Sequence, residues 1–259
     1  MNVLLALRYD GSKYAGWQRQ ENAVAVQQVV EDTLSKLLGE KITIYGAGRT
    51  DAGVHAYRQF ANFHIKESRV SIGKLPYAMQ VFLPEDIVCY DALEVEELFH
   101  ARKSAIEKEY RYFFYTEKSV SPFLNKRAVF FDGSVEAIRQ NVNIFLGKHD
   151  FSAFVCANNP RRDPDVSPIR TITSIGVRFS KSYRAGYIYV RSSGFLYKMV
   201  RRIVGCLFDL GRGRITDSKV LSMLKSGGRD IDWNTALPYG LYLWKVKYHF
   251  AADMPFKRT

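Results

Sequence analysis

The stretch GAGRTDAGVHA, residues 46–56, places three glycines around one arginine and one aspartate and contains no lysine. Glycines this dense usually mark a turn, or a place where the backbone passes close to another group. Two phosphate-binding motifs fail here, because the dinucleotide fingerprint needs a glycine where Asp51 stands and the P-loop needs a lysine after its last glycine. What remains is a predicted strand that enters a glycine-lined turn and presents Arg49 and Asp51.

The chemistry of this turn would come from Asp51. A carboxylate beside an arginine tends to stay ionised, because the positive charge favours the charged form. Such a carboxylate can act as a nucleophile or as a base. The alternative is a structural pair of Arg49 and Asp51 that ties the loop down. The neighbouring glycines favour the catalytic interpretation, because they clear space beside the side chain.

The composition indicates a globular protein that meets a polyanion. The 259 residues suffice for one large domain or two small ones. An excess of 38 Lys and Arg over 26 Asp and Glu gives a formal net charge of +12, which favours encounter with nucleic acid. No apolar run approaches the roughly 18 residues of a membrane-spanning helix, so we expect a cytoplasmic protein without a membrane partner.

Cysteine and histidine patterns point to neither a disulfide framework nor a metal site. The three cysteines, Cys89, Cys156 and Cys206, are odd in number and far apart. The five histidines form no HExxH motif and have no CxxC partner. We therefore expect no bound metal.

Four segments have the apolar periodicity of an amphipathic helix: residues 26–38, 135–146, 195–209 and 216–224. Gly39 and Gly147 are the expected ends of the first two, and Ser134 is the expected N-cap of the second. Nine segments have the pattern typical of strands: residues 2–10, 41–48, 58–66, 86–95, 108–116, 149–155, 173–180, 186–193 and 242–250. The strands at 172–179 and 187–193, joined by a short polar turn, are expected to form an antiparallel hairpin.

These elements do not alternate regularly as parallel strand–helix–strand units, so the class is α+β with a mainly antiparallel sheet. The two parts of the chain have a similar order of elements, which suggests a duplicated architecture with a central cleft. We place the halves at residues 1–104, with the catalytic loop 46–56, and 105–259, with the basic helix 195–209. No linker separates them, so we expect one continuous sheet flanked by helices.

Three further segments could contact a polyanion. In EKEYRYFFY, residues 107–115, alternation predicts a core face and leaves open whether Tyr110 stacks on a base. In SGFLYKMVRRIVG, residues 193–205, the basic side chains project away from the apolar stripe, as a solvated face or as an RNA contact. The loop 156–168 carries Arg161 and Arg162, as a clamp on a polyanion or as ordinary surface.

Together, GAGRTDAGVHA, KEYRYFFY and FLYKMVRRIVG resemble the TruA-type tRNA pseudouridine synthases. The resemblance covers nearly the whole chain, since YDGSKYAGWQRQ, LPEDI, FHAR, GKHDFSAF and LPYGLYLWKVKY follow in the family's order. It implies the pseudouridine synthase fold, in which two similar α+β halves share a continuous antiparallel sheet with a basic cleft between them. It also implies a homodimer that binds tRNA, not DNA, and modifies uridines in the anticodon arm.

The resemblance also implies roles for individual residues. Asp51 matches the catalytic aspartate, and Arg201 matches the arginine that pairs with it. Tyr110 matches the tyrosine that contacts the flipped uridine, and Leu241 matches an apolar residue that packs on the target base. Arg49 would contact RNA and brace the loop.

Two positions depart from the family's pattern. Arg202 stands where asparagine is frequent, and Lys198 replaces a frequent histidine. Both add positive charge, and we include them among the predicted RNA-binding residues. They leave open which of Arg201 and Arg202 meets Asp51.

Isomerisation of uridine to pseudouridine transfers no group and no electrons, so it requires no cofactor. The base must leave its stack, which costs a few kcal/mol and calls for an aromatic or apolar partner. Asp51 could then attack C1′ or C6, or remove the 2′ proton. Two rival hypotheses are a non-catalytic RNA-binding module and a carboxylate-based hydrolase of nucleosides or glycosides. The second is poorly supported, because no second acid is evident near Asp51.

Overall fold

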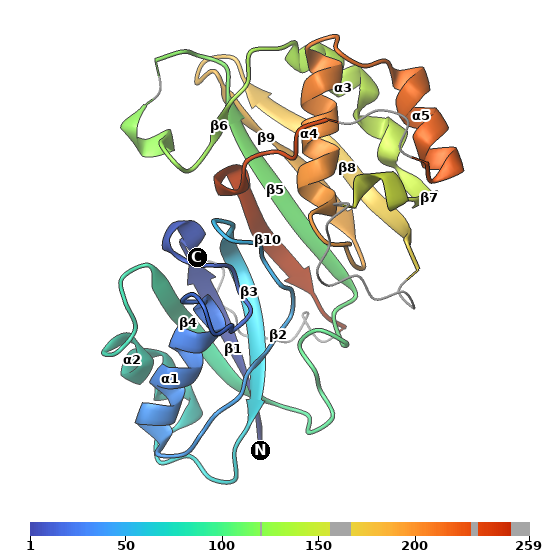
Figure 1. Ribbon diagram of the computed structural model, residues 1–259. Helices are drawn as coiled ribbons and strands as arrows, with labels where there is room; N and C mark the ends of the chain where they lie inside the picture. The colour runs from blue at the N-terminus through green and yellow to red at the C-terminus, as the bar shows by residue number, and fades with distance from the viewer. Residues whose placement is uncertain (120, 156–166, 229–232, 250–259) are drawn as a thin grey trace. The chain divides into compact units, whose positions relative to one another are not determined.

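The computed structural model describes residues 1–259 except 120, 156–166, 229–232 and 250–259 (Figure 1). It divides into two compact units, which are described separately below. Unit 1 comprises Met1–Lys108 and Tyr242–Thr259, and unit 2 comprises Glu109–Leu241. The chain thus passes between the units within β5 (Glu107–Tyr115) and within β10 (Leu241–Lys247). The two halves 1–104 and 105–259 stay a prediction.

Unit 1 is built on antiparallel strands: β1 (Asn2–Tyr9), β2 (Tyr45–Gly46), β3 (His55–His64) and β4 (Ile87–Val95). The strand order is β4-β1-β3-β10, and β2 pairs with β3 near its C-terminal end, at Ala61 and Asn62. β1 is antiparallel to both neighbours, and β10 runs parallel to β3 where Tyr242 meets His55. The side chains from Val3 to Leu7 are fully buried, so β1 is the central strand of this core.

The predicted strand 41–48 is wrong over most of its length, since only β2 is extended and paired. The reason lies in helix α1 (Val26–Leu38), whose side chains take the backbone N–H groups that a strand would offer to a neighbour. The Ile42 N–H donates to Oγ of Ser35, and the Ile44 N–H donates to Oε1 of Glu31. Side chains of a helix therefore replace a strand partner here.

Helix α1 itself is confirmed from its first to its last predicted residue. Gly39 ends it with a φ of 78°, and its N–H donates to the Ser35 carbonyl, as a glycine C-cap should. Val30 and Leu34 are fully buried beneath it. The remaining helical segments of unit 1 are short: η1 (Gly11–Lys13), η2 (Ile72–Lys74) and α2 (Leu75–Gln80).

Unit 2 contains β5 and four more described strands: β6 (Val129–Phe130), β7 (Gly147–Asp150), β8 (Ile169–Ser180) and β9 (Ala185–Ser192). Their order is β5-β9-β8-β7, with β6 parallel to β5. The antiparallel hairpin predicted for β8 and β9 is confirmed. The strand predicted at 149–155 ends at Asp150, whose side chain accepts the Ser152 N–H and starts the 3-10 turn η5 (Ser152–Phe154).

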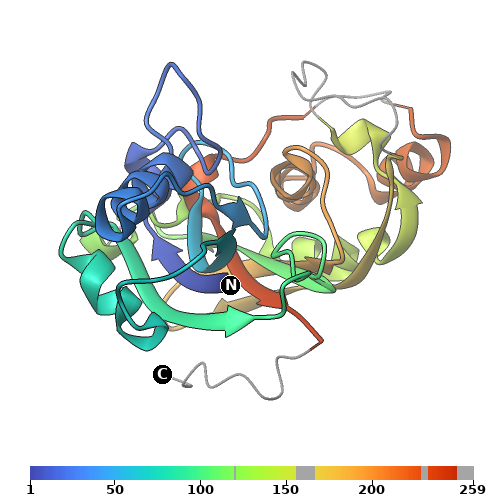
Figure 2. The same ribbon diagram turned by 90° about the horizontal axis from the view of Figure 1, so that it is seen from below.

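The three other predicted helices all lie in unit 2: α3 (Val135–Asn141), continued by the 3-10 turn η4 (Val142–Phe145), α4 (Met199–Gly211) and α5 (Asp217–Ser226). Ser134 caps α3 through the Ala137 N–H, as predicted. Leu146, predicted on the buried face, is exposed, because the last turn tightens to 3-10 and the chain leaves the helix at Leu146. Figure 2 shows α4 over one face of β8 and β9.

Helix α4 begins four residues later than predicted. Lys198 has a φ of 56°, in the left-handed region that a right-handed helix cannot include, so Phe195 and Leu196 precede the helix. The buried stripe is otherwise as expected, because Met199 and Ile203 have no exposed surface.

An aromatic cluster forms the core of unit 2. Phe208 of α4 stacks on Phe131 at a centroid distance of 4.5 Å, and it meets Tyr112 and Phe114 of β5 edge-on. Gly211 lies so close to this cluster that a Cβ there would come within 2.6 Å of the Phe131 ring. The predicted inward face of β5 is therefore confirmed.

The predicted α+β class with a mainly antiparallel sheet is confirmed in each unit. The continuous sheet and the basic cleft concern the placement of one unit against the other, and they stay predictions. Among the described residues, no helix combines the length and the apolar character needed to cross a bilayer.

Replacing Phe208 by alanine should destabilise unit 2 by about 3–5 kcal/mol, because it leaves a cavity against Tyr112, Phe114 and Phe131. The same change at Phe123, whose side chain is 88% exposed, should stay within about 0.5 kcal/mol. Urea unfolding followed by circular dichroism measures both. Similar losses for the two variants would contradict the aromatic core.

Candidate active site

The Asp51 loop, residues 46–56, connects β2 to β3 in unit 1. Gln59 of β3 holds its middle: the side-chain Nε2 donates to the Gly48 carbonyl at 2.7 Å, and the Gly48 N–H donates back at 3.3 Å. The hydroxyl of Tyr9 lies 2.8 Å from Oγ1 of the buried Thr50. Asp51 itself is partly exposed and Arg49 is exposed. The residues that precede Asp51 are thus held in place, while Asp51 itself is partly accessible to solvent.

The N-terminal strap, residues 14–17, supports the loop from its other side. The Trp17 N–H donates to the Thr50 carbonyl at 3.0 Å, and the Gly53 N–H donates to the Tyr14 carbonyl at 3.3 Å. Gly16 has a φ of 95°, and a Cβ there would lie 2.6 Å from the Thr50 carbonyl oxygen and 3.1 Å from the carbonyl carbon of Asp51. Only glycine allows this approach. The strap therefore touches the peptide unit of Asp51 directly.

Two glycines of the Asp51 loop, Gly46 and Gly53, are needed for reasons other than the predicted clearance beside Asp51. A Cβ on Gly46 would lie 2.5 Å from the indole of Trp17, so the space beside Gly46 is filled by protein and not left for a nucleotide. Gly53 has a φ of 76°, which a turn requires and most side chains disfavour. The prediction that the flanking glycines clear space for a nucleotide is wrong for Gly46.

The C-terminal end of the loop is fixed by a buried histidine that sequence reasoning considered only as a metal ligand. Nδ1 of His55 lies 2.9 Å from Oδ1 of Asp10, and the Gly11 N–H donates to the same nitrogen at 3.1 Å. The imidazole also stacks on Tyr242, with centroids 4.5 Å apart. Nothing in the sequence pattern reveals this role, because it depends on the close packing of Gly11 against Val54, where a Cβ on Gly11 would lie 2.0 Å from the Val54 carbonyl oxygen.

Tyr110 lies on the inward face of β5 in unit 2. Its side chain is 8% exposed, and its ring packs edge-on against Phe195 at a centroid distance of 5.2 Å. Phe195 thus holds the orientation of the ring. A stacking role toward a base stays a prediction.

Arg201 lies on α4 and bonds Ala236, in the segment of chain that leads to Leu241. Its Nε donates to the Ala236 carbonyl at 2.8 Å, and the Ala236 N–H donates to the Arg201 carbonyl at 3.1 Å. The Tyr112 hydroxyl fixes the next residue by donating to the Leu237 carbonyl at 2.9 Å. Leu241 then begins β10 as a buried side chain. Unit 2 thus brings β5, α4 and the approach to Leu241 together.

Arg202 was expected to project away from the packed face of α4, and this expectation is wrong. Its side chain is 4% exposed, because the chain at Trp233 packs over it. Nη1 donates to the Trp233 carbonyl at 2.9 Å, the guanidinium lies 4.5 Å from the centre of the indole, and the indole N–H donates to the Arg202 carbonyl. Arg202 therefore anchors this segment.

The other predicted RNA-binding residues occupy different places. Lys198 precedes α4, and its Nζ lies 5.0 Å from the centre of the Tyr197 ring. Arg161 and Arg162 lie outside the described residues. Asp51 and Arg49 belong to unit 1, and the other described candidates belong to unit 2, so their assembly into one site stays a prediction.

Burial sets the protonation of two tyrosines near these elements. It raises the pKa of Tyr9, beside Thr50, although hydrogen bonds partly oppose the rise. It also raises the pKa of Tyr112, against an opposing effect of the Arg201 charge. Both phenols therefore remain protonated at neutral pH, and that of Tyr112 acts as a hydrogen-bond donor. Among the described residues, no group of three or more His, Cys, Asp and Glu side chains could hold a metal ion.

Comparison with known proteins places the chain in a family. A family model described as tRNA pseudouridine synthase matches residues 5–102 and 142–249. The tRNA pseudouridine synthase A of a Thermoanaerobacter species is 39% identical over 249 residues, which are 95% of this chain and 99% of that protein. The enzyme of the same name from Chlamydia trachomatis serovar A is 36% identical over 252 residues, 95% of this chain and 91% of that protein.

The chain therefore belongs to the tRNA pseudouridine synthase family. This membership confirms the resemblance and the predicted enzyme class, an isomerase that acts on tRNA. Among solved structures, the archaeal box H/ACA sRNP Nop10–Cbf5 complex matches with a TM-score of 0.35 and 12% identity, over 80% of this chain and 43% of that chain. A likeness at that level supports no conclusion.

Replacing Gly16 by alanine should destabilise unit 1 by about 1–3 kcal/mol or more, because the positive φ is strained and the new methyl group meets the Thr50 carbonyl. Gly73→Ala is the matched control, since a Cβ there has no heavy atom within 4 Å. Urea unfolding of the two variants measures the difference. Equal stability would contradict the close approach of strap and loop.

Proposed function

We propose that the protein converts uridine to pseudouridine in the anticodon arm of tRNA, with Asp51 as the essential carboxylate and without a cofactor. Family membership over nearly the whole chain supports the reaction and the tRNA substrate. The observation that supports Asp51 is the set of contacts that hold Thr50 before it and Gly53 after it. A carboxylate aimed at a substrate needs such a fixed backbone.

The reaction breaks the bond between N1 of the base and C1′ of the ribose. The base then turns and rejoins C1′ through C5, and the hydrogen of C5 is exchanged for the one that N1 gains. One proton leaves C5 and another joins N1, so the composition of the nucleotide is unchanged and the net change is an isomerisation. The target base must leave its stack before a side chain can reach it.

Two of the proposed residues take part in the reaction, and two others hold the target base. Asp51 acts on the ribose or the ring, and the guanidinium of Arg201 keeps it ionised. Because Arg202 is committed to Trp233, we assign this pairing to Arg201. Tyr110 and Leu241 would pack on the extruded base, as aromatic and apolar side chains do in other base-flipping enzymes.

Contacts to the RNA backbone would come from the exposed basic residues. The net charge of +12 favours tRNA binding in general, and Arg49, Lys198 and the pair Arg161 and Arg162 are its proposed local contributors. We also propose a cytoplasmic homodimer, with light scattering of the purified protein as its test. A monomer at all concentrations would contradict the dimer.

The Asp51→Ala variant should form no detectable pseudouridine, a loss of at least about 10³-fold, because no other group is proposed to react with the nucleotide. Its affinity for tRNA should change by less than about threefold, since phosphate contacts dominate binding. Tritium release from tRNA labelled at C5 of uracil measures turnover, and filter binding measures affinity.

The exposed acid Glu40, replaced by glutamine, is the control for Asp51 and should release tritium at the normal rate. Tritium release by Asp51→Ala at that same rate would refute the proposed function. Free uracil among the products would instead indicate a hydrolase.

Replacing Tyr110 by alanine should lower turnover by at least about 100-fold more than it lowers tRNA affinity, because the ring is proposed to pack on the base. Tyr110→Phe keeps the ring and its contact with Phe195, so it separates stacking from the hydroxyl. Tyr183→Ala, at a side chain that is 82% exposed, is the control. Normal turnover by Tyr110→Ala, in single-turnover assays of folded protein, would remove Tyr110 from the site.

A further inference from the structure

Helix α1 begins without a side-chain cap, because Ala25 stands at its N-cap position. The first N–H groups of a helix have no partner within the helix. Here two of them use the N-terminal strap: the Val26 N–H donates to the Gly16 carbonyl at 3.1 Å, and the Gln27 N–H donates to the Trp17 carbonyl at 2.9 Å. The strap that touches the Asp51 peptide on one side thus caps α1 on the other.

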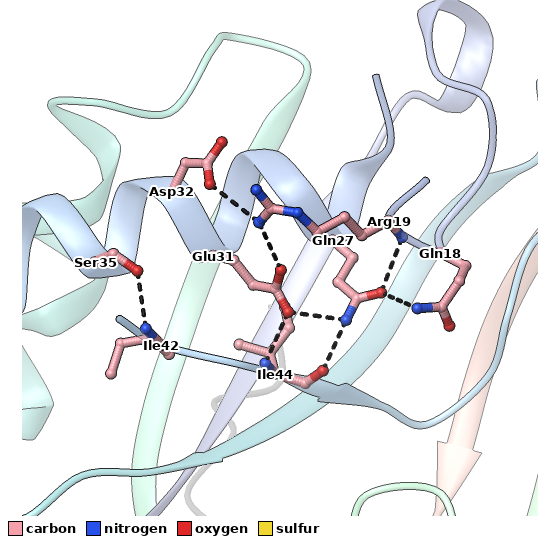
Figure 3. Close-up of polar contacts among 8 residues, drawn as sticks. All are labelled: Gln18, Arg19, Gln27, Glu31, Asp32, Ser35, Ile42 and Ile44. Carbon is pink, nitrogen blue, oxygen red and sulfur yellow. Dashed lines mark hydrogen bonds and ion pairs between the residues drawn. The ribbon is translucent and has the colours of Figure 1, made fainter. Parts of the chain in front are cut away.

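One turn further along α1, a buried carboxylate continues the same connection. Glu31 is 4% exposed, and Figure 3 shows it between Arg19, Gln27 and the backbone of Ile44. It accepts hydrogen bonds from Nη1 of Arg19 at 2.9 Å, from Nε2 of Gln27 at 2.9 Å and from the Ile44 N–H at 3.1 Å. Three donors around one buried charge offset the cost of removing it from water.

The side chain of Gln27 extends this network to the residues just after the strap and to those just before the Asp51 loop. Its Oε1 accepts from Nε2 of Gln18 at 2.7 Å and from the Arg19 N–H at 3.0 Å. Its Nε2 also donates to the Ile44 carbonyl at 3.1 Å. Glu31 and Gln27 therefore fix the residues that follow the strap and the residues that precede the Asp51 loop (Figure 3).

The side chains of Glu31 and Gln27 are buried in unit 1, and neither is among the residues proposed to contact RNA. Two routes connect the network to the loop. One runs from the main-chain N–H of Gln27 through the main chain of Trp17 to the Thr50 carbonyl. The other runs from the side chains of Gln27 and Glu31 through Ile44 into the start of the loop at Gly46. Trp17 joins the routes, because its ring fills the space beside Gly46.

We infer that Glu31 is a positioning residue for Asp51: together with Gln27 it sets the distance between α1, the N-terminal strap and the Asp51 loop. This inference rests on the proposed function, in which Asp51 is the reacting group. Arg19 and the Ile44 N–H bond different oxygens of Glu31, and an amide has only one oxygen. In Glu31→Gln one of these two donors therefore faces an NH2 group in place of an acceptor, so the strap and the loop can shift relative to each other. A displacement of about 1 Å in a reacting group can cost about 100-fold in rate.

The test is the Glu31→Gln variant, which keeps the volume and removes the charge. We expect kcat for tritium release to fall by about 10- to 100-fold, while Kd for tRNA stays within about twofold. Asp32→Asn is the matched control: Asp32 also pairs with Arg19, but it is exposed and bonds neither Gln27 nor Ile44. Its kcat should stay within about twofold of the unmodified protein.

A second variant separates positioning from a general loss of stability. Gln27→Ala should lower kcat as Glu31→Gln does, and the double variant should lose little more than the worse single variant, because both break one network. Circular dichroism and thermal unfolding confirm that the rates are measured on folded protein. Multiplicative losses in kcat would show two independent effects and overturn the inference.

The outcomes distinguish the inference from the proposed function. If the unmodified protein is active, Asp51→Ala is inactive and Glu31→Gln has a normal kcat, the inference is wrong and the proposed function stands. If Glu31→Gln raises Kd for tRNA and leaves kcat unchanged, Glu31 serves binding and the inference is again wrong. If Asp51→Ala is active, the proposed function fails first.

Discussion

The Asp51 loop depends on one close approach between two backbones, that of Gly16 and that of Thr50 to Ala52. A side chain at Gly16 would overlap the Thr50 carbonyl, so the two chains can meet only at a glycine. Hydrogen bonds from Trp17 and Gly53 hold the contact on both sides. The conformation around the proposed catalytic carboxylate is thereby set by main-chain geometry, with the side chain left to reach the surface.

Helix α1 and strand β3 support the contact between the strap and the Asp51 loop. The strap caps α1, and buried side chains of α1 hold the segment that enters the Asp51 loop. On its far side the loop runs into β3, where Gln59 fixes its middle. A reacting group supported in this way needs little rearrangement when RNA arrives, which is the condition for efficient catalysis by a single carboxylate.

Much of the fold could be predicted from sequence, because periodicity reports burial. Helix α1 and the β8–β9 hairpin have regular patterns and were located correctly. The errors occur where side chains replace regular partners: Glu31 takes the N–H of a predicted strand at Ile44, and Trp233 covers Arg202. A pattern of residue types does not reveal such contacts between distant segments. For the same reason the motif around Asp51 is visible in the sequence, while the contact of this loop with the strap is not.

Amide hydrogen exchange in the absence of RNA tests the central claim, that the protein alone holds the Asp51 loop in place. The informative amides are those of Trp17 and Gly53, which bond the strap to the loop. We predict that they exchange as slowly as amides paired between β1 and β3. Exchange at the rate of an exposed turn, with protection appearing only when tRNA binds, would show that the substrate orders the loop and would contradict this account.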